Sequence, residues 1–442
     1  MVTVGIVVVI LVVAGVIGFT FLTSKTTTSS SSTTSSSSST TQTTSSLSLV
    51  NTGSSTFFSS SSMTLTSADS SFSSSGTTAF TSTSSYTGSG SSTSTETTSS
   101  TSSTTSYSSL PPVTIDESGS TTMYPLWTLW VPSFTSIYPD VMINTAATGS
   151  GVGQTCAEEN LCNIGASDAY LLPYQEGQYP WILNIPLNVG AQQINYNLPQ
   201  LPPNTHLNFS GPLLTEIYNG TITKWNDPRI AAVNQGVASE LPNIPIITVH
   251  RLDSSGETFV FSQFLSFTDP WWNAIIGYGT LVAWPNLPTA QTGLYNAGMI
   301  NVCQEYVGCI AYVGISYIQI ASGVGLGYGA ILNQAGNYVL PNQTTMEATL
   351  NATYTTVPPD ERVSLVNAPG ADSYPEVFFE YALVSKNQTN ADMMTDLQAF
   401  LTWSLQSNGG DSPSLLNQVN FVALPPSIAQ LSQDQINEIT LV

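Results

Sequence analysis

The chain has 442 residues, with six Lys or Arg, 27 Asp or Glu and a net charge of −21. Nucleic acid is thereby excluded as a partner, because binding to its phosphate backbone needs a cluster of cations. A small anion is still compatible with this charge, since helix N-termini and hydroxyl groups bind anions locally. Charged residues make up only 7% of the chain. So low a fraction suggests an acidic exterior, where carboxylates are partly protonated.

The first segment is almost wholly apolar from residue 2 to residue 22. At about 1.5 Å per residue, a helix of this length crosses a bilayer. We therefore expect residues 1–25 to be a transmembrane anchor, with the rest of the chain outside the plasma membrane. A cleaved signal segment is the alternative.

Residues 26–110 are dominated by Ser and Thr and have almost no charge. Such a segment buries too little apolar surface to fold, so we expect a disordered and O-glycosylated stalk. Further along there are five N-x-S/T sequons, which favour a location at the cell surface. They lie at Asn208, Asn219, Asn342, Asn351 and Asn387.

Residues 111–442 have a globular composition and are long enough for two lobes. Strand-like and helix-like patterns alternate along them, which favours an α/β architecture. In chain order the expected elements are strands at Val141–Ala147, Ile182–Val189 and Ile194–Leu198, a helix at Leu213–Tyr218, a strand at Ile244–Val249, a helix at Thr258–Phe267, strands at Val307–Val313 and Phe378–Val384, and a helix at Met393–Leu405.

The four cysteines fall into two local pairs, Cys156 with Cys162 and Cys303 with Cys309. A metal site would need a nearby His or a C-x-x-C spacing, and neither is present. We expect two local disulfides, with buried thiols as the alternative.

Turns rich in Gly, Ser and Thr precede three expected helices, at residues 119–123, 148–153 and 253–256. Each turn offers hydroxyls and free N–H groups to an anion. Arg251, just before the third turn, adds a charge with a forked set of donors. Asp168 would accept a proton carried by the ligand, although a helix cap or a turn is the commoner role of such an aspartate.

At these residues the chain resembles the phosphate-binding protein of the ABC-type phosphate uptake system. The matching segments are 119–123, 148–151, 164–168, 214–230, 251–259, 308–313 and 424–428. The resemblance implies a two-lobed periplasmic-binding-protein fold, class II-like, with hinge strands. Lobe 1 would comprise about residues 113–200 and 368–442, and lobe 2 about residues 201–367.

The resemblance also implies which residues bind phosphate, with Met123 using its backbone N–H and Asp253 bracing Arg251. The implied ligand residues are Thr122, Met123, Ser150, Asp168, Arg251, Ser255, Gly256, Glu257 and Thr258. Because sulfate has no proton to give Asp168 near neutral pH, the site would reject it.

Three positions depart from the family pattern: Met123 replaces Phe, Ser254 replaces Gly, and Glu257 replaces Thr. The last departure matters most. An ionised carboxylate aimed inward would oppose the binding of an anion. One aimed outward would leave only its N–H in the site, and one that is neutral in acid would not repel the anion.

The resemblance implies an extracellular solute-binding protein that captures inorganic phosphate and hands it to an ABC permease, without a cofactor or a metal. The alternatives are binding of another tetrahedral oxyanion and a surface-layer or adhesion role. We do not expect an enzyme. A hydrolase using Ser255 would need His206 or His250 as its base, and neither lies in a recognisable triad context or near a G-x-S-x-G motif.

Overall fold

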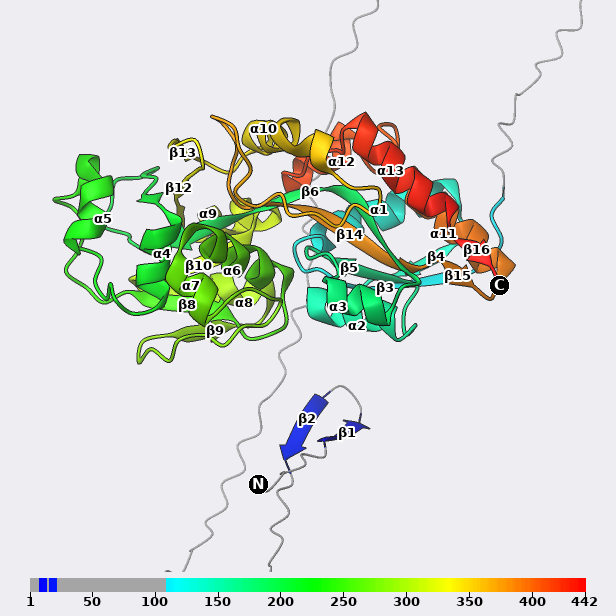
Figure 1. Ribbon diagram of the computed structural model, residues 1–442, viewed down its shortest axis with the longest axis horizontal. Helices are drawn as coiled ribbons and strands as arrows, with labels where there is room; N and C mark the ends of the chain where they lie inside the picture. Colours follow the sequence, from blue (N-terminus) through cyan, green and yellow to red (C-terminus); the bar gives the residue numbers. More distant parts are fainter. Residues whose placement is uncertain (1–7, 14–15, 22–108) are drawn as a thin grey trace, which may run out of the picture. The chain divides into compact units, whose positions relative to one another are not determined.

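The computed structural model describes residues 8–13, 16–21 and 109–442 (Figure 1). The chain divides into two units, Met1–Thr97 and Thr98–Val442. In the first unit, strand β1 (Val8–Val13) pairs antiparallel with strand β2 (Val16–Phe21).

The anchor predicted over residues 1–25 is not seen as a helix. Its described residues are β1 and β2, and its other residues lie outside the described part of the chain. Among the described residues, no helix is long and apolar enough to cross a membrane. The predicted stalk, residues 26–110, also lies outside the described residues except at its last two positions. Both segments remain predictions.

The strands of the second unit are β3 (Thr114–Gly119), β4 (Met142–Asn144), β5 (Ile164–Ser167), β6 (Ile182–Tyr196), β7 (Asn208–Phe209), β8 (Ile247–Arg251), β9 (Gln291–Gly293), β10 (Cys309–Gly314), β11 (Gly327–Tyr328), β12 (Ala330–Leu332), β13 (Tyr338–Val339), β14 (Val377–Ser385), β15 (Asn387–Gln388) and β16 (Thr440–Leu441).

Its helices are α1 (Tyr124–Ile137), α2 (Ser150–Glu158), α3 (Pro173–Gln178), α4 (Gly211–Tyr218), α5 (Pro228–Val233), α6 (Gly256–Thr268), α7 (Pro270–Ile275), α8 (Tyr295–Glu305), α9 (Ile318–Gly323), α10 (Gln343–Thr353), α11 (Ala391–Ser404), α12 (Pro413–Val419) and α13 (Pro426–Asn437). Short 3₁₀ helices are η1 (Gln235–Val237), η2 (Ile315–Tyr317) and η3 (Tyr354–Thr356).

The predicted α/β class is confirmed, and each strand or helix expected from the sequence overlaps an observed one. The two strands expected at Ile182–Val189 and Ile194–Leu198 are one continuous strand, β6. Gly190 lies inside it and does not interrupt the pairing, because it faces Phe378 of β14 in register.

A nine-stranded sheet organises the second unit, in the order β4-β3-β5-β14-β6-β10-β8-β9, with β11 also paired to β6. Strand β6 pairs with β14 over residues 182–191 and with β10 over residues 192–196. It therefore joins two halves of the sheet, a first half that contains β3, β4, β5 and β14 and a second half that contains β8, β9 and β10. Figure 1 shows α1–α3 beside the first half and α6–α8 beside the second.

The two halves present the carboxyl ends of their parallel strands to each other. Strands β3, β4 and β5 run parallel to β6, whereas β8 and β10 run antiparallel to it. The carboxyl end of β10, Gly314, pairs with Gln192 of β6. Strand β5 ends at Ser167, which is level with Pro186 of β6 because both pair with Tyr381 of β14. Loops that follow these strands therefore meet near the centre of the sheet, where α/β proteins bind ligands.

Aromatic side chains form the core of each half. Between α1 and α11, Trp127 stacks on Phe400 with ring centroids 5.3 Å apart, and Trp130 meets both rings edge-on. In the second half, Phe261 of α6 stacks on Tyr312 of β10 at 4.7 Å. Burial of each such ring stabilises the folded state by about 2–3 kcal/mol. The loops of both halves are therefore anchored to a well-packed core.

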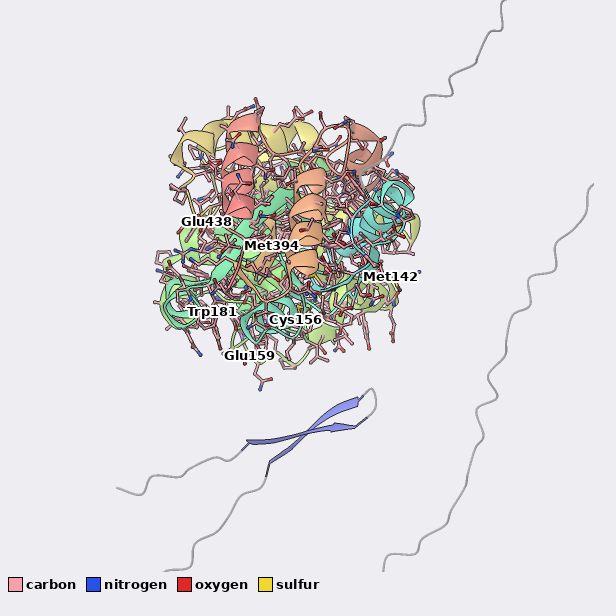
Figure 2. All side chains as sticks on the ribbon, turned by 90° about the vertical axis from the view of Figure 1, so that its right-hand side faces the viewer. Met142, Cys156, Glu159, Trp181, Met394 and Glu438 are labelled. Carbon is pink, nitrogen blue, oxygen red and sulfur yellow. A yellow bond between two sulfur atoms is a disulfide. The ribbon has the colours of Figure 1, made fainter. Side chains whose placement is uncertain are left out.

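Two disulfides are present, Cys156 with Cys162 and Cys303 with Cys309, as predicted. Their Cα atoms are 5.4 and 5.2 Å apart, in the usual range for a bridge. The first bridge ties the end of α2 to the loop before β5, and the second ties α8 to β10. Figure 2 shows the position of Cys156, below the helix of Met394.

Several carboxyl groups are buried and form no salt bridge with the described residues, among them Glu361 and Glu376. Burial raises the pKa of Glu376 to about 8, against a smaller lowering by its hydrogen bond from Gln192 at 3.0 Å. Burial likewise raises the pKa of Glu361 to about 8, although Gln435 and Ser432 donate to it. Both acids hold their protons in the folded protein below about pH 8.

We predict that the folded protein becomes less stable as pH rises from about 4.3 to 8. In this window the folded state holds protons on Glu376 and Glu361 that the unfolded state, with ordinary carboxyl pKa values near 4.3, has released. The stability that these two protonated acids give the folded state is complete below about pH 4.3 and lost above about pH 8. Thermal unfolding followed by circular dichroism should show a midpoint roughly 5–10 °C lower at pH 8 than at pH 4.

Glu376→Gln mimics the neutral acid, so its midpoint should fall less over the same range. Glu240→Gln, at an exposed position, should behave like the natural chain. A midpoint that is constant or rises from pH 4 to pH 8 would contradict the assignment.

Candidate ligand-binding site

The first turn of the site follows β3, where Gly119 brings the backbone against β5. A side chain at Gly119 would collide with the carbonyl oxygen of Ala166. The Ser120 hydroxyl donates to Asp168 and accepts the Met123 N–H at 2.9 Å. The Met123 N–H, expected to face the ligand, is therefore used within its own turn, while the Thr122 hydroxyl points to the centre of the site.

The second and third contributions come from α2 and from the end of β5. Ser150 begins α2, and its hydroxyl accepts the Asp168 N–H at 3.2 Å. The Asp168 side chain is buried, and its Oδ2 receives no hydrogen bond from a hydroxyl, amide or guanidinium group of the described residues. The buried carboxyl of Glu380 can hydrogen-bond to Asp168 when one of the two acids holds a proton.

Arg251 ends β8 and is only 2% exposed. Its Nε donates to Asp253 at 2.8 Å, a second guanidinium nitrogen donates to the other oxygen of Asp253, and Nη1 donates to Glu257 at 2.7 Å. Its backbone N–H donates to the Tyr312 hydroxyl at 3.0 Å. The aromatic core of the second half thus fixes the backbone of Arg251, and Asp253 fixes the plane of its guanidinium.

Glu257 turns inward. Its carboxylate accepts from Arg251, from the Ser255 hydroxyl at 2.6 Å, from the Thr122 hydroxyl and from the amide of Asn296. Of the two orientations that the sequence left open, the structure has the inward one. The donors of the predicted oxyanion site therefore converge on a carboxylate of the chain itself.

Asn296 is a central residue that the sequence did not reveal. Its amide nitrogen lies 3.0 Å from the hydroxyl oxygen of Thr121 and 3.2 Å from that of Thr122, and its Oδ1 accepts the Gly314 N–H at 2.9 Å. The stretch around it, Tyr295-Asn296-Ala297-Gly298, has no turn or anion motif. Only the spatial proximity of α8 to the turn after β3 brings it into the site.

Two residues expected in the third turn have other tasks. The Thr258 hydroxyl lies 2.8 Å from that of Tyr312, which accepts the Arg251 N–H. Gly256 lets the start of α6 approach the first half closely, because a Cβ there would lie 2.5 Å from Cβ of Asp168 and 2.6 Å from Oγ of Ser150. A side chain at Gly256 would push the two halves apart.

The charges of the cluster are strongly coupled to one another. Burial would raise the pKa of Glu257, but the charge of Arg251 and the hydrogen bonds of Ser255 and Thr122 outweigh it and lower the pKa to about 2. Burial, and next the charge of Glu257, raise the pKa of Asp168 to about 7. Burial and the neighbouring Asp168 also raise the pKa of Glu380, a second acid that the sequence did not single out. Glu257 is thus ionised, while Asp168 and Glu380 tend to hold protons.

The hydrolase alternative finds no support in this geometry. The Ser255 hydroxyl donates to Glu257, not to a histidine. The His250 ring stacks on Trp284 at 4.8 Å, and Nδ1 of His206 lies 2.8 Å from the carbonyl oxygen of Tyr328.

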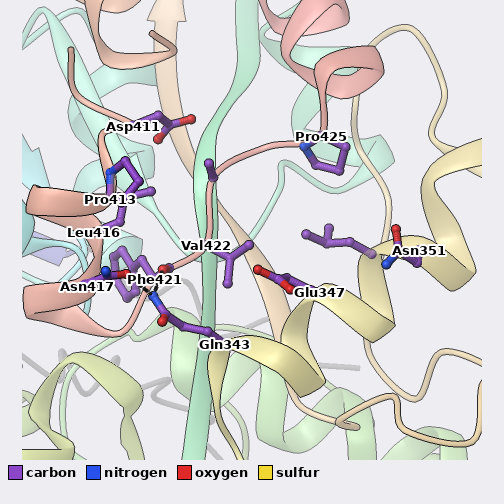
Figure 3. A pocket seen from close by; sticks show the side chains of 12 residues that line it. Gln343, Glu347, Asn351, Asp411, Pro413, Leu416, Asn417, Phe421, Val422 and Pro425 are labelled. Carbon is purple, nitrogen blue, oxygen red and sulfur yellow. Dashed lines mark hydrogen bonds between the residues drawn. The ribbon is translucent and has the colours of Figure 1, made fainter. Parts of the chain in front are cut away.

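A separate pocket of about 450 Å³ lies between α10 and the segment from Asp411 to Pro425 (Figure 3). Gln343, Glu347 and Phe421 line it. None of the predicted ligand residues does, so this pocket is distinct from the Arg251 cluster.

Known proteins resemble the chain over most of the second unit. A family model described as "PBP superfamily domain" matches residues 26–408. The "Phosphate-binding protein PstS" of Methanocaldococcus jannaschii is 30% identical over 329 residues, which cover 70% of this chain and 82% of that protein. The protein of the same name from Pasteurella multocida is 30% identical, with 73% and 89% covered.

Solved structures share the fold. One is a high-affinity periplasmic phosphate-binding protein, PfluDING, bound with phosphate, with a TM-score of 0.57, 18% identity, and coverage of 73% of this chain and 93% of that one. The phosphate-binding protein from Stenotrophomonas maltophilia gives a TM-score of 0.57 at 16% identity with the same coverage. The chain has the α/β periplasmic-binding-protein fold and belongs to the phosphate-binding protein PstS family.

Proposed function

We propose that this protein is an extracellular solute-binding protein that captures inorganic phosphate and delivers it to an ABC transporter permease. The observation that carries the proposal is the convergence of Thr122, Ser255 and Arg251 on one buried anionic group, with Ser150 and Asp168 beside it. The PstS relatives, named as phosphate-binding proteins, support phosphate as the ligand.

In this proposal the site replaces the water around phosphate with fixed donors. Arg251 supplies a charge that stays in place because Asp253 holds its guanidinium on two nitrogens. Hydroxyls from opposite halves of the sheet, Thr122 and Ser255, supply neutral donors. Charge-assisted hydrogen bonds in a buried site are stronger than those in water, so a small number of them suffices to hold a dehydrated anion.

Asp168 gives the site its selectivity in this proposal. When Asp168 is ionised, above its pKa of about 7, its Oδ2 would accept a hydrogen bond from the hydroxyl of a protonated phosphate. Sulfate carries no proton near neutral pH, so its oxygens would face the lone pairs of Asp168 when that group is ionised. An unmade hydrogen bond of this kind costs about 1–3 kcal/mol, and more between charged groups.

Capture would involve closure of two lobes, at about residues 113–200 with 368–442 and at about 201–367. Strand β6 is the natural hinge, since it pairs with β14 in the first half and with β10 in the second. Both lobes contribute donors, so a bound anion would hold them together. The closed form would then present one surface to the permease.

We also propose that residues 1–25 anchor the protein in the plasma membrane and that residues 26–110 act as a glycosylated stalk. A flexible stalk of about 85 residues has a reach of roughly 50 Å, enough to search near the membrane and still dock on a permease. The second candidate function is binding of a tetrahedral oxyanion other than phosphate. The observation that favours it is the inward carboxylate of Glu257, which departs from the family pattern at the ligand site.

Calorimetric titration of the full chain with phosphate, sulfate and arsenate at pH 8, above the pKa of about 7 of Asp168, tests the role of that residue. We expect the natural chain to bind phosphate and reject sulfate. Asp168→Asn should weaken phosphate binding by about tenfold or more and narrow the gap to sulfate, because the amide can donate to an oxygen that carries no proton. Asp140→Asn, at an exposed position, is the control. Unchanged selectivity in Asp168→Asn would refute the assignment, and sulfate or arsenate bound in preference to phosphate would favour the second candidate.

Titration of two arginine variants tests the role of Arg251. Arg251→Ala should weaken phosphate binding by about a hundredfold or more, because the ligand loses its cation, as do the buried carboxylate of Glu257 and the half-buried one of Asp253. Arg229 also pairs with two carboxylates, Asp227 and Glu216, but its side chain is 42% exposed. Arg229→Ala should therefore bind phosphate like the natural chain. Equal affinities of the two variants would show that Arg251 does not hold the ligand.

A further inference from the structure

The carboxylate of Glu257 takes the hydrogen bonds that an oxyanion would need. Oε1 accepts from Thr122 and Asn296, with Thr121 at 3.5 Å, and Oε2 accepts from Arg251 and Ser255. These donors come from four separate places: the turn after β3, the end of β8, the start of α6, and α8. A carboxylate accepts about four hydrogen bonds, so these four donors saturate Glu257.

Glu257 is not needed to neutralise Arg251. Asp253 already pairs with that guanidinium through two nitrogens. With Glu257 the cluster holds two carboxylates for one cation. An additional anion would meet strong repulsion in this low-dielectric space, so an anionic ligand and the inward carboxylate compete for one place.

Glu257 also connects the two halves of the sheet. It starts from α6 in the second half and accepts from Thr122 in the first. Near it, the Gly151 N–H of α2 donates to the Ser254 carbonyl at 3.0 Å, a bond that also crosses between the halves. The carboxylate therefore does for the chain what a bound anion would do, since it links donors of both lobes.

We propose that Glu257 is an internal ligand, which occupies the oxyanion site, holds the lobes closed and must be displaced before phosphate binds. This inference rests on the proposed function and adds a specificity-determining residue to it. The long side chain of Glu257 can leave the site by rotation, and each ligand must outcompete a group that is always present at high effective concentration. Weakly binding anions would then be excluded.

Calorimetric titration of the full chain with phosphate at pH 7 tests the competition. Glu257→Thr removes the carboxylate and keeps a hydroxyl at the start of α6, and Glu257→Gln removes only the charge. We expect Glu257→Thr to bind phosphate at least about tenfold more tightly than the natural chain, the factor that applies when nine-tenths of the molecules are self-occupied. The phosphate affinity of Glu257→Gln should lie between those of Glu257→Thr and the natural chain. The control Glu240→Thr, on the surface, should bind phosphate with the affinity of the natural chain.

The outcomes separate this inference from the proposed function. If Glu257→Thr binds phosphate no more tightly than the natural chain, the internal-ligand role is wrong while phosphate binding stands. If neither protein binds phosphate, the proposed function fails and the inference fails with it.

Hydrogen exchange of the Gly151 amide provides a second test that does not depend on affinity. In the natural chain this amide should be protected both without and with phosphate, because Glu257 holds the lobes together in the first case and the bound phosphate does so in the second. Glu257→Gln keeps the shape of the natural side chain, so it can be used even if the Thr variant does not fold. In Glu257→Gln, protection of the Gly151 amide should drop without phosphate and return when phosphate is added. Equal protection of the two proteins without phosphate would overturn the closing role.

Discussion

The buried ion cluster of Arg251, Asp253 and Glu257 is the interaction on which the site depends. A guanidinium that is 2% exposed is stable only if its donors are satisfied, and both carboxylates contribute to that. The cluster fixes the end of β8, the start of α6 and, through Thr122 and Asn296, the turn after β3 and the helix α8. Loss of one member would leave the others charged and buried. The same donors that bind Glu257 are those we propose for phosphate, so the stability of the closed chain and ligand binding draw on one set of hydrogen bonds.

The sheet explains why these residues meet. Strands β3, β4 and β5 of the first half and β8 and β10 of the second run in opposite directions, so that their carboxyl ends face each other across β6. Loops at carboxyl ends carry the hydroxyls, and helix starts behind them carry free N–H groups. Gly256 permits the close contact between α6 and the first half. Aromatic stacks in the core, such as Phe261 on Tyr312, support these loops. The Tyr312 hydroxyl also accepts the Arg251 N–H, which fixes the end of β8.

The sequence predicts much of this fold because its signals are local. Apolar runs mark the strands, Ser and Gly mark the helix starts at Ser150 and Gly256, and the cysteine spacing marks both disulfides. The oxyanion turns were recognisable for the same reason. Asn296 and Glu380 were not, since their roles come from contacts between elements far apart in the chain. The direction of the Glu257 side chain was also beyond the sequence, because it depends on the balance between burial and the field of Arg251.

We propose that one buried site, centred on Arg251, holds either Glu257 or phosphate. A crystal structure of the protein grown with phosphate would distinguish the two occupants. We expect a phosphate that contacts Arg251, Thr122 and Ser255, with the Glu257 carboxylate rotated away from these donors. Phosphate bound elsewhere, while Glu257 still accepts from Arg251 and Thr122, would show that the two do not compete for this site.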